Sequence, residues 1–276
     1  MLLQSIKRSI SLESPIVMGI LNATPDSFFE GSRVFSLNAV VDKAGEMLQQ
    51  GATILDIGGQ STRPGSIQVG SQEEINRIYP VIEIIRKHFP DCLISVDTYY
   101  SDVIKQVGSL DIDIVNDISS GDDDPNMLPT VAAGGWYYIA MHKKGNPTTM
   151  QQNPSYLKPI TEEVHDYFST KSNEFADAGI LNWALDPGFG FGKTLAHNYE
   201  LMHHFHQLHS FQRPILIGIS RKSMIYKLLN TSADDALNGS TALHMYALNQ
   251  GAHILRVHDV KEAMETIQIF NEIQRR

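Results

Sequence analysis

The segment ILDIGGQSTRPGSIQVGSQEEINRIYPVIEIIRKHFPDCLISVD, residues 54–97, contains the repeating unit that decides the fold. It opens with an apolar run over Ile54 to Gly59 and closes with another over Leu93 to Asp97. Neither run shows sustained polar alternation, which is typical of strands buried on both faces of a parallel sheet. The segment therefore predicts two parallel strands separated by a crossover.

The crossover contains a helical pattern with clear ends. Ser71-Gln-Glu-Glu74 has the spacing of a capping box, and the chain reaches a helix-stopping Pro90. Isoleucines recur at helical spacing between these limits, at Ile75, Ile78, Ile82 and Ile85. We expect an amphipathic helix whose apolar face covers the sheet.

The same unit recurs along the whole chain. The other apolar runs are Ile16 to Asn22, Ile112 to Ile118, Trp136 to His142, Trp183 to Asp186, Ile215 to Ser220 and Ile254 to His258. Helices between them are predicted to end near Gly51, Gly179 and Gly251, and Asp259-Val-Lys-Glu262 is expected to cap the last one. Eight strands alternating with helices in 276 residues favour one domain, residues 1–276, folded as a (β/α)8 TIM barrel. An open doubly wound sheet is the alternative.

Two connections are unusually long and rich in Gly, Ser and Pro. They follow the first two strands, at Ala23 to Leu37 and Gln60 to Gly70. Loops of this length often bind or cover a ligand.

Composition excludes several classes of function. The net charge is −9, without a cluster of basic and aromatic residues, so a nucleic-acid partner is not expected. No run approaches the length of a membrane span. The single Cys92 permits no intrachain disulfide, and Lys7 and Arg8 interrupt the first residues, so we expect a cytoplasmic protein without a signal peptide.

Polar residues stand at the ends of the predicted strands. In a parallel barrel these ends share one face with the following loops, and that face carries the chemistry. Any one of them could instead cap a helix or satisfy a turn. The set comprises Asn22, Ser61, Thr62, Arg63, Asp97, Asn116, Asp117, Met141, His142, Asp186, Ser220, Arg221, Lys222, Arg256 and His258.

The cations and carboxylates of this set divide between strands. Arg221, Lys222, Arg256 and His258 belong to strands seven and eight, where barrels commonly bind phosphate, so a phosphorylated ligand is expected. Asp97, Asn116 and Asp186 lie on strands three, four and six. A buried carboxylate suits paired N–H donors, so a guanidine-like heterocycle is a natural ligand.

Two tempting motifs do not meet their requirements. The stretch ending in Lys193-Thr194 resembles a phosphate-binding loop, but Pro187 stands where the first glycine is needed. The histidines between His203 and His209 lack a matching carboxylate, so a solvated helix face is favoured over a metal site.

Eight ordered motifs resemble those of the dihydropteroate synthases and cover nearly the whole chain. They are Met18 to Phe28, Asp56 to Pro64, Ser95 to Thr98, Val115 to Ile118, Met141 to Pro147, Leu185 to Lys193, Gly218 to Lys222 and Arg256 to His258. The resemblance implies condensation of (7,8-dihydropterin-6-yl)methyl diphosphate with 4-aminobenzoate, giving 7,8-dihydropteroate and diphosphate in folate biosynthesis. It also implies a homodimer and Mg²⁺ bound through Asn22.

The resemblance further implies a role for each matching residue. Asp97, Asn116, Asp186 and Lys222 would hold the pterin, with Met141, Phe191 and Gly218 completing its site. Asn22, Arg63, Arg256 and His258 would hold the diphosphate, and Phe28, Thr62, Pro64, Lys222 and Ser223 the 4-aminobenzoate. Lys222, Asp97 and Arg63 would carry the catalysis.

The chain departs from the family pattern at its loops. Gln60 replaces a usual Glu, the stretch Phe29 to Ser32 replaces a commoner one with Asp, and Lys143 is atypical. Two alternatives share the pterin cradle: a methyltransferase using methyltetrahydrofolate, and a non-enzymatic pterin carrier. The methyltransferase has no use for a diphosphate cage, and the carrier could lack the loop residues.

Overall fold

The computed structural model describes residues 1–275 apart from 6, 24–32, 61–67 and 146–153. Within these residues, an eight-stranded sheet runs in the order β8-β7-β6-β5-β4-β3-β10-β9. All its pairings are parallel. The strands are β3 (Ile16–Asn22), β4 (Ile54–Gly58), β5 (Leu93–Asp97), β6 (Ile114–Asp117), β7 (Tyr137–Met141), β8 (Trp183–Asp186), β9 (Leu216–Ile217) and β10 (Ile254–Val257).

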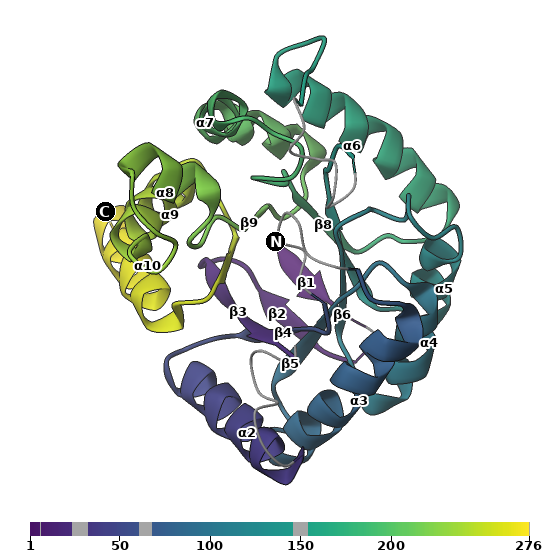
Figure 1. Ribbon diagram of the computed structural model, residues 1–276. Coiled ribbons are helices and arrows are strands. Elements are labelled where there is room, and N and C mark those ends of the chain that lie inside the picture. The colour runs from purple at the N-terminus through teal and green to yellow at the C-terminus, as the bar shows by residue number, and fades with distance from the viewer. Residues whose placement is uncertain (6, 24–32, 61–67, 146–153, 276) are drawn as a thin grey trace.

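One further contact closes the sheet on itself. Leu185 of β8 forms a parallel bridge with Ile215, and its N–H donates to the Pro214 carbonyl at 3.0 Å. The strands therefore enclose a barrel, with the helices outside it (Figure 1). The predicted (β/α)8 barrel is confirmed, and the open sheet is wrong.

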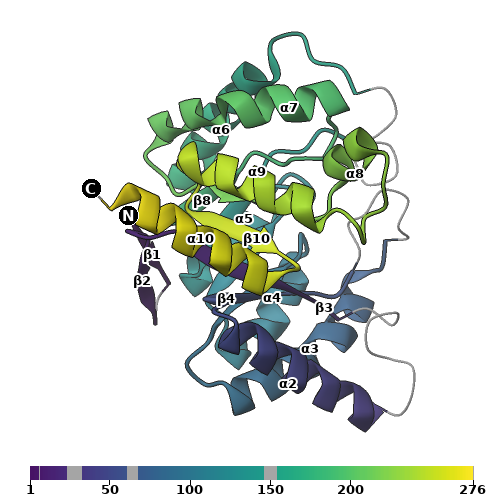
Figure 2. The same ribbon diagram turned by 90° about the vertical axis from the view of Figure 1, so that its left-hand side faces the viewer.

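Helices connect successive strands and pack against their outward side chains. They are α2 (Arg33–Gln49), α3 (Ser71–His88), α4 (Ser101–Val107), α5 (Met127–Gly134), α6 (Ile160–Asp177), α7 (Leu195–His204), α8 (Ser223–Leu229), α9 (Leu237–Asn249) and α10 (Val260–Gln274), with 3-10 turns η1 (Gly108–Leu110) and η2 (Phe205–Phe211). Figure 2 shows α9 and α10 side by side on the outside of the barrel. Of the helices in the described ranges, none combines the length and apolar character needed to cross a bilayer.

Strand residues alternate between two separate cores. Outward residues such as Leu55 and Val96 join the large cluster shared with the helices. Inward residues near the strand starts form a second cluster, which includes Met18, Ile54, Leu93, Ile114, Ala184, Leu216 and Ile254. The next inward positions on several of these strands are polar, for example Asp56, Asn116 and Arg256. The barrel interior is thus apolar where the strands begin and polar where they end.

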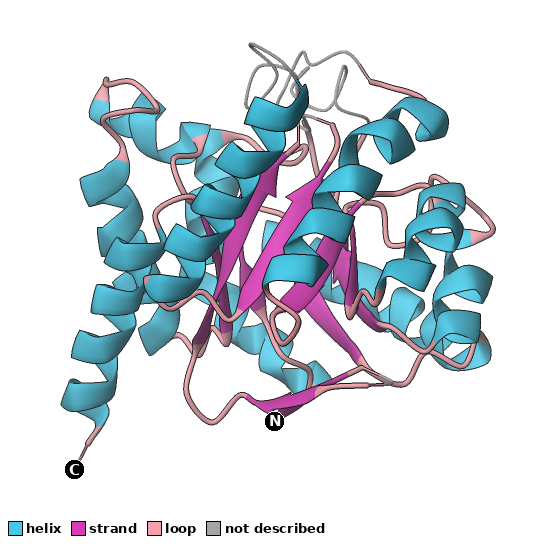
Figure 3. Cartoon of the chain, turned by 90° about the horizontal axis from the view of Figure 1, so that it is seen from below, coloured by secondary structure: helices cyan, strands magenta, loops and turns pink. Residues whose placement is uncertain are grey.

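A short hairpin covers the end of the barrel where the strands begin (Figure 3). Strands β1 (Leu2–Gln4) and β2 (Ser9–Ser11) pair antiparallel, and Leu3 joins the inner cluster. Arg8 in the turn pairs with Asp113 at 2.9 Å. Sequence analysis did not anticipate this hairpin, because three-residue strands carry too little pattern.

The predicted helix starts are correct, but neither predicted capping box forms. The N-cap of α3 is Gly70 without a side-chain bond, and Glu74 is instead buried beside Gln60. Asp259 is the N-cap residue of α10, as predicted, but its side chain makes no cap bond, because its carboxylate pairs with Arg221. The predicted C-terminal glycines are confirmed: Gly51, Gly179 and Gly251 have φ of 105°, 83° and 90°.

Candidate active site

Arg256 is held between two carboxylates inside the barrel. Its Nε lies 2.6 Å from Asp56 Oδ2 and its Nη2 lies 2.5 Å from Asp97 Oδ2. Burial raises the pKa of Asp97 to about 7, although the charge of Arg256 opposes the shift. The Arg256 pKa stays above its usual value, because the two carboxylates outweigh the effect of burial. Arg256 therefore remains a cation, and Asp97 titrates near neutrality.

Asp56 is a site residue that sequence analysis missed. It is fully buried and accepts from both Arg256 and Asn116, whose Nδ2 lies 3.1 Å away. Asp56 stands inside the apolar run of β4 rather than at its end, so a reading of strand ends passed over it. The available signal was the alternation of Ile54, Asp56 and Gly58 on the inward face.

Asp186 and Lys222 both lie close to Gly218. A Cβ built on Gly218 would lie 3.8 Å from Asp186 Oδ2 and 3.9 Å from Lys222 Nζ. Burial raises the pKa of Asp186 and lowers that of Lys222 to about 8, while the attraction between their charges opposes both shifts. A side-chain carbon on residue 218 would thus lie in van der Waals contact with both a carboxylate and an ammonium group.

The loop after β8 orients both of these groups through its main chain. The Gly188 N–H donates to Asp186 Oδ1 at 2.8 Å, and the Phe189 carbonyl accepts from Lys222 Nζ at 2.7 Å. Gly188, Gly190 and Gly192 have φ of 72°, 86° and 68°, a region that other residues adopt at a cost. The glycine spacing therefore serves the conformation of this loop.

An apolar surface lies next to the charged groups. Met141, Phe191, Tyr99 and Ile118 form a small cluster of their own. Lys222 Nζ lies 4.7 Å from the centre of the Phe191 ring. This surface could contact a flat heterocycle while the carboxylates accept from its edge.

The remaining described candidates lie around the end of the barrel. The His258 N–H donates to Ser220 Oγ at 3.2 Å. Ser223 is the first residue of α8, directly after Lys222. Asn22 is the half-buried last residue of β3.

Arg221 does not belong to the predicted cation group. Its guanidinium pairs with Asp259 and donates to the Ala233 and Asp234 carbonyls. Its backbone has a φ of 54°, which turns the chain between Ser220 and Lys222. The expectation that Arg221 contributes to a phosphate site is therefore corrected, because its donors are occupied by protein acceptors.

Five predicted site residues lie outside the described residues: Phe28, Ser61, Thr62, Arg63 and Pro64. Gln60, directly before the last four of them, is described and buried, with Nε2 3.2 Å from Glu74 Oε2. Tyr99 OH donates to Gln60 Oε1 at 3.3 Å. Gln60, the departure from the family pattern, is thus tied to α3 and to the segment after β5.

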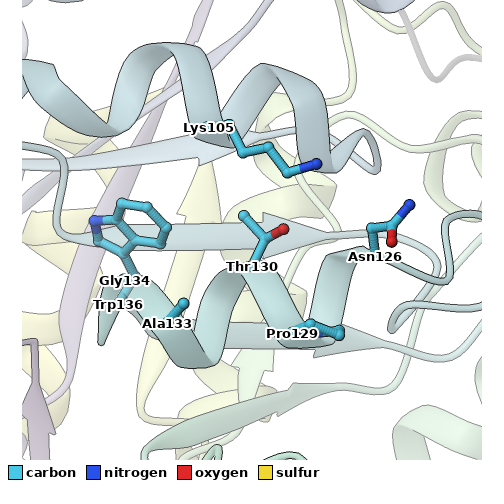
Figure 4. A pocket seen from close by; sticks show the side chains of 7 residues that line it. All are labelled: Lys105, Asn126, Pro129, Thr130, Ala133, Gly134 and Trp136. Atoms are coloured by element: carbon cyan, nitrogen blue, oxygen red, sulfur yellow. The ribbon is translucent and has the colours of Figure 1, made fainter.

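A separate groove lies between α4 and α5 (Figure 4). It has a volume of about 500 Å³ and is lined by Lys105, Asn126, Pro129, Thr130, Ala133, Gly134 and Trp136. The Trp136 ring packs directly against Gly134, because a Cβ built on Gly134 would lie 2.1 Å from a ring atom of Trp136. The described charged groups inside the barrel, among them Arg256, Asp186 and Lys222, do not line this groove.

Comparison with known proteins agrees with this geometry. The pterin binding enzyme family matches residues 18–258. The dihydropteroate synthase of Escherichia coli (strain K12) is 46% identical over 263 residues, covering 95% of this chain and 92% of that protein. The dihydropteroate synthase of Haemophilus influenzae is 40% identical and covers 98% of each chain.

Solved structures of dihydropteroate synthases are also similar to this chain. The Yersinia pestis dihydropteroate synthase, in complex with a sulfonamide drug, superposes with a TM-score of 0.93 at 42% identity over 99% of each chain. The Xanthomonas albilineans enzyme, with 4-aminobenzoic acid, has a TM-score of 0.91 at 33% identity, over 100% of this chain and 98% of that one.

These matches define the chain as a pterin-binding barrel enzyme. The relatives and the solved structures named above are all dihydropteroate synthases. The chain belongs to the dihydropteroate synthases, which are transferases.

Proposed function

We propose that the polar end of this barrel is where the chain condenses (7,8-dihydropterin-6-yl)methyl diphosphate with 4-aminobenzoate. The products are 7,8-dihydropteroate, an intermediate of folate biosynthesis, and diphosphate. The observation that carries the proposal is the position of Asp186 and Lys222, both close to Gly218, beside the Asp56–Arg256–Asp97 cluster. This arrangement offers acceptors for a heterocycle and cations for a leaving group at one place.

The pterin is assigned to the acidic side of the site. Asp186 would accept from its amino group and ring N–H, because a carboxylate matches two parallel donors. Asn116 and Asp97 would contact its other edge, while Met141 and Phe191 lie against the ring. Gly218 leaves room for the ring to approach the main chain.

The diphosphate is assigned to the cationic side. Arg256, Lys222 and His258 would stabilise the charge that develops as the methylene C–O bond breaks. The 4-aminobenzoate nitrogen then forms the new C–N bond and loses its proton to solvent or diphosphate. Arg63, Thr62, Pro64 and Phe28 are proposed to complete the leaving-group and 4-aminobenzoate sites together with Ser223.

We propose Mg²⁺ as the cofactor, bound through Asn22. Among the described residues no group of three or more His, Cys, Asp or Glu side chains could hold a metal ion. Mg²⁺ commonly uses one or two protein oxygens and takes its other ligands from substrate phosphates and water. The Asn22 amide oxygen fits that role. When bound, the ion supplies positive charge to the departing diphosphate.

Residues 1–276 are proposed to form one domain, because Leu3 of the hairpin packs in the barrel's inner cluster. Homodimerisation is supported by Leu228 and Leu229 on α8, which are 50% and 52% exposed. A cytoplasmic location is supported by the unpaired Cys92.

The deciding experiment measures diphosphate release from the pterin diphosphate with Mg²⁺, with and without 4-aminobenzoate. Release that depends on 4-aminobenzoate is expected. Asp186→Asn should abolish pterin binding, while Asp123→Asn, which loses only a pairing with Lys143, should bind normally. Folded protein that releases no diphosphate would refute the assignment.

A further inference from the structure

We propose that Lys193 is a positioning residue, which holds the loop between β8 and α7 in the conformation that orients Asp186 and Lys222. The inference rests on the proposed function, because Lys193 would act on the reaction only through these two groups. In the sequence, Lys193 stands in a stretch that resembles a phosphate-binding loop but has Pro187 in place of the first glycine.

Lys193 is buried to an unusual degree for a lysine. Its side chain is 2% exposed, and an ammonium group out of water is costly unless acceptors surround it. Nζ lies 2.8 Å from the Gly188 carbonyl, 2.9 Å from His142 Nδ1 and 3.3 Å from the Phe191 carbonyl. These acceptors belong to both ends of the loop and to the segment after β7, so one side chain ties them together.

The contact with Gly188 leads directly to the site. Lys193 holds the Gly188 carbonyl, and the N–H of the same residue donates to Asp186 Oδ1. The next carbonyl, that of Phe189, accepts from Lys222. A shift of Gly188 would therefore change the orientation of Asp186 and move the acceptor of Lys222.

The loop depends on such restraint because of its glycines. Three of its residues adopt positive φ, and glycine has more conformational freedom to lose than any other residue. The Gly190 N–H donates to Asn198 Oδ1 at 2.7 Å. Lys193 Nζ donates to the carbonyls of Gly188 and Phe191, which come before and after Gly190 in the loop. A Cβ on Gly188 would lie 1.8 Å from the His142 carbonyl, so the loop also packs directly on that segment.

His142 completes the clamp as a neutral acceptor. Burial lowers its pKa well below the usual value, and the charge of Lys193 adds to that shift. A neutral ring has one unprotonated nitrogen, and the tautomer with its proton on Nε2 presents Nδ1 as an acceptor to Lys193. Burial also lowers the Lys193 pKa, while the charge of Asp186 opposes this.

The test replaces Lys193 with methionine, which keeps the length and apolar stem but removes every donor. Lys144→Met is the matched control, because Lys144 is exposed and its Nζ donates to the Ser155 carbonyl instead. Both variants and the wild type are compared by thermal unfolding and by fluorescence titration with a hydroxymethyl pterin that carries no diphosphate. Turnover is then measured as a function of pH.

For Lys193→Met we expect pterin Kd to rise about 10- to 100-fold in protein that remains folded. We attribute the fall of kcat/KM at alkaline pH to Lys222, whose pKa burial lowers to about 8. This fall should move to higher pH in the variant, because a looser loop leaves Lys222 less buried. Lys144→Met should match the wild type in both measurements. A purely structural role would lower the unfolding temperature without moving either quantity.

Pterin affinity within about twofold of the wild type would overturn the proposal. If the methionine variant does not fold, Lys193→Gln, which is polar and shorter, is measured in the same way. Failure of both to fold would also overturn it, since the residue would then serve the fold itself. Wild-type protein that binds pterin but releases no diphosphate would refute the proposed function while leaving the comparison of pterin Kd valid.

Discussion

Arg221 and Asp259 form a bidentate ion pair, with Nε 2.8 Å from Oδ2 and Nη2 2.9 Å from Oδ1. Arg221 directly precedes Lys222, and Asp259 directly follows His258. The pair therefore joins the ends of β9 and β10, where two proposed diphosphate ligands lie. Arg221 shapes this part of the site although it is not placed to bind the ligand itself.

Arg221→Met should weaken diphosphate binding by only several-fold, because it removes a support rather than a ligand. The side chains are 24% and 20% exposed, so we expect the pair to contribute about 1 kcal/mol to stability. Calorimetric titration of Arg221→Met and of Arg256→Gln with diphosphate and Mg²⁺ checks the predicted loss of binding. A loss as large as that of Arg256→Gln would show that Arg221 is a direct ligand.

Asp56→Asn should lower kcat/KM for the pterin diphosphate by about 10- to 100-fold, since Arg256 loses one of its two anchoring charges. Ser95→Ala is the matched control, because Ser95 is the register partner of Asp56 and is equally buried. Steady-state kinetics of both variants distinguish a specific effect from general disturbance of the barrel interior. Equal losses in the two would contradict a specific role for Asp56.

Activity should depend on pH through Asp97 and Lys222. Asp97 must be ionised to accept from the pterin, so kcat/KM should fall below its pKa of about 7. Lys222 must be protonated, so kcat/KM should also fall above about 8. We expect a narrow maximum between these values in the pH profile for the pterin diphosphate. Lys222→Arg should remove the alkaline limb, because arginine stays charged.

Gly218→Ala should raise pterin Kd about tenfold or more while leaving the unfolding temperature unchanged. The added Cβ would have no protein atom closer than 3.8 Å, so it fits the protein and occupies space assigned to the ligand. Gly70→Ala, with no neighbour within 4 Å, is the control. Unchanged pterin binding in Gly218→Ala would place the heterocycle elsewhere.

Much of the fold follows from features that lie close together in the sequence. The apolar runs predicted every barrel strand, and Asp97, Asn116, Asp186 and Arg256 lie at or near the strand ends as expected. The bounds differ most at β9, where the predicted run Ile215 to Ser220 contains a strand of only Leu216–Ile217, because residues 218–220 have no ladder pairing.

The errors arise where a distant partner decides what a side chain does. Glu74 and Asp259 have the local spacing of caps, but the side chains pair with Gln60 and Arg221 instead. Asp56 was missed because its partners, Asn116 and Arg256, come from strands far along the chain. Local pattern predicts which elements form, whereas these pairings depend on how the barrel closes.

The loop after β8 presents main-chain atoms to the site, and this has a consequence for sequence variation. The carbonyl that receives Lys222 belongs to Phe189, whose own side chain is buried in the outer core. Exchanging that side chain for another apolar one leaves the carbonyl in place, so changes at residue 189 should seldom alter ligand binding. Gly188 and Gly192 allow no such freedom, because a Cβ on either would lie within 2.3 Å of a carbonyl oxygen. Inherited changes that modify inhibitor response should therefore be rare at these glycines, and should arise instead where side chains meet the ligand.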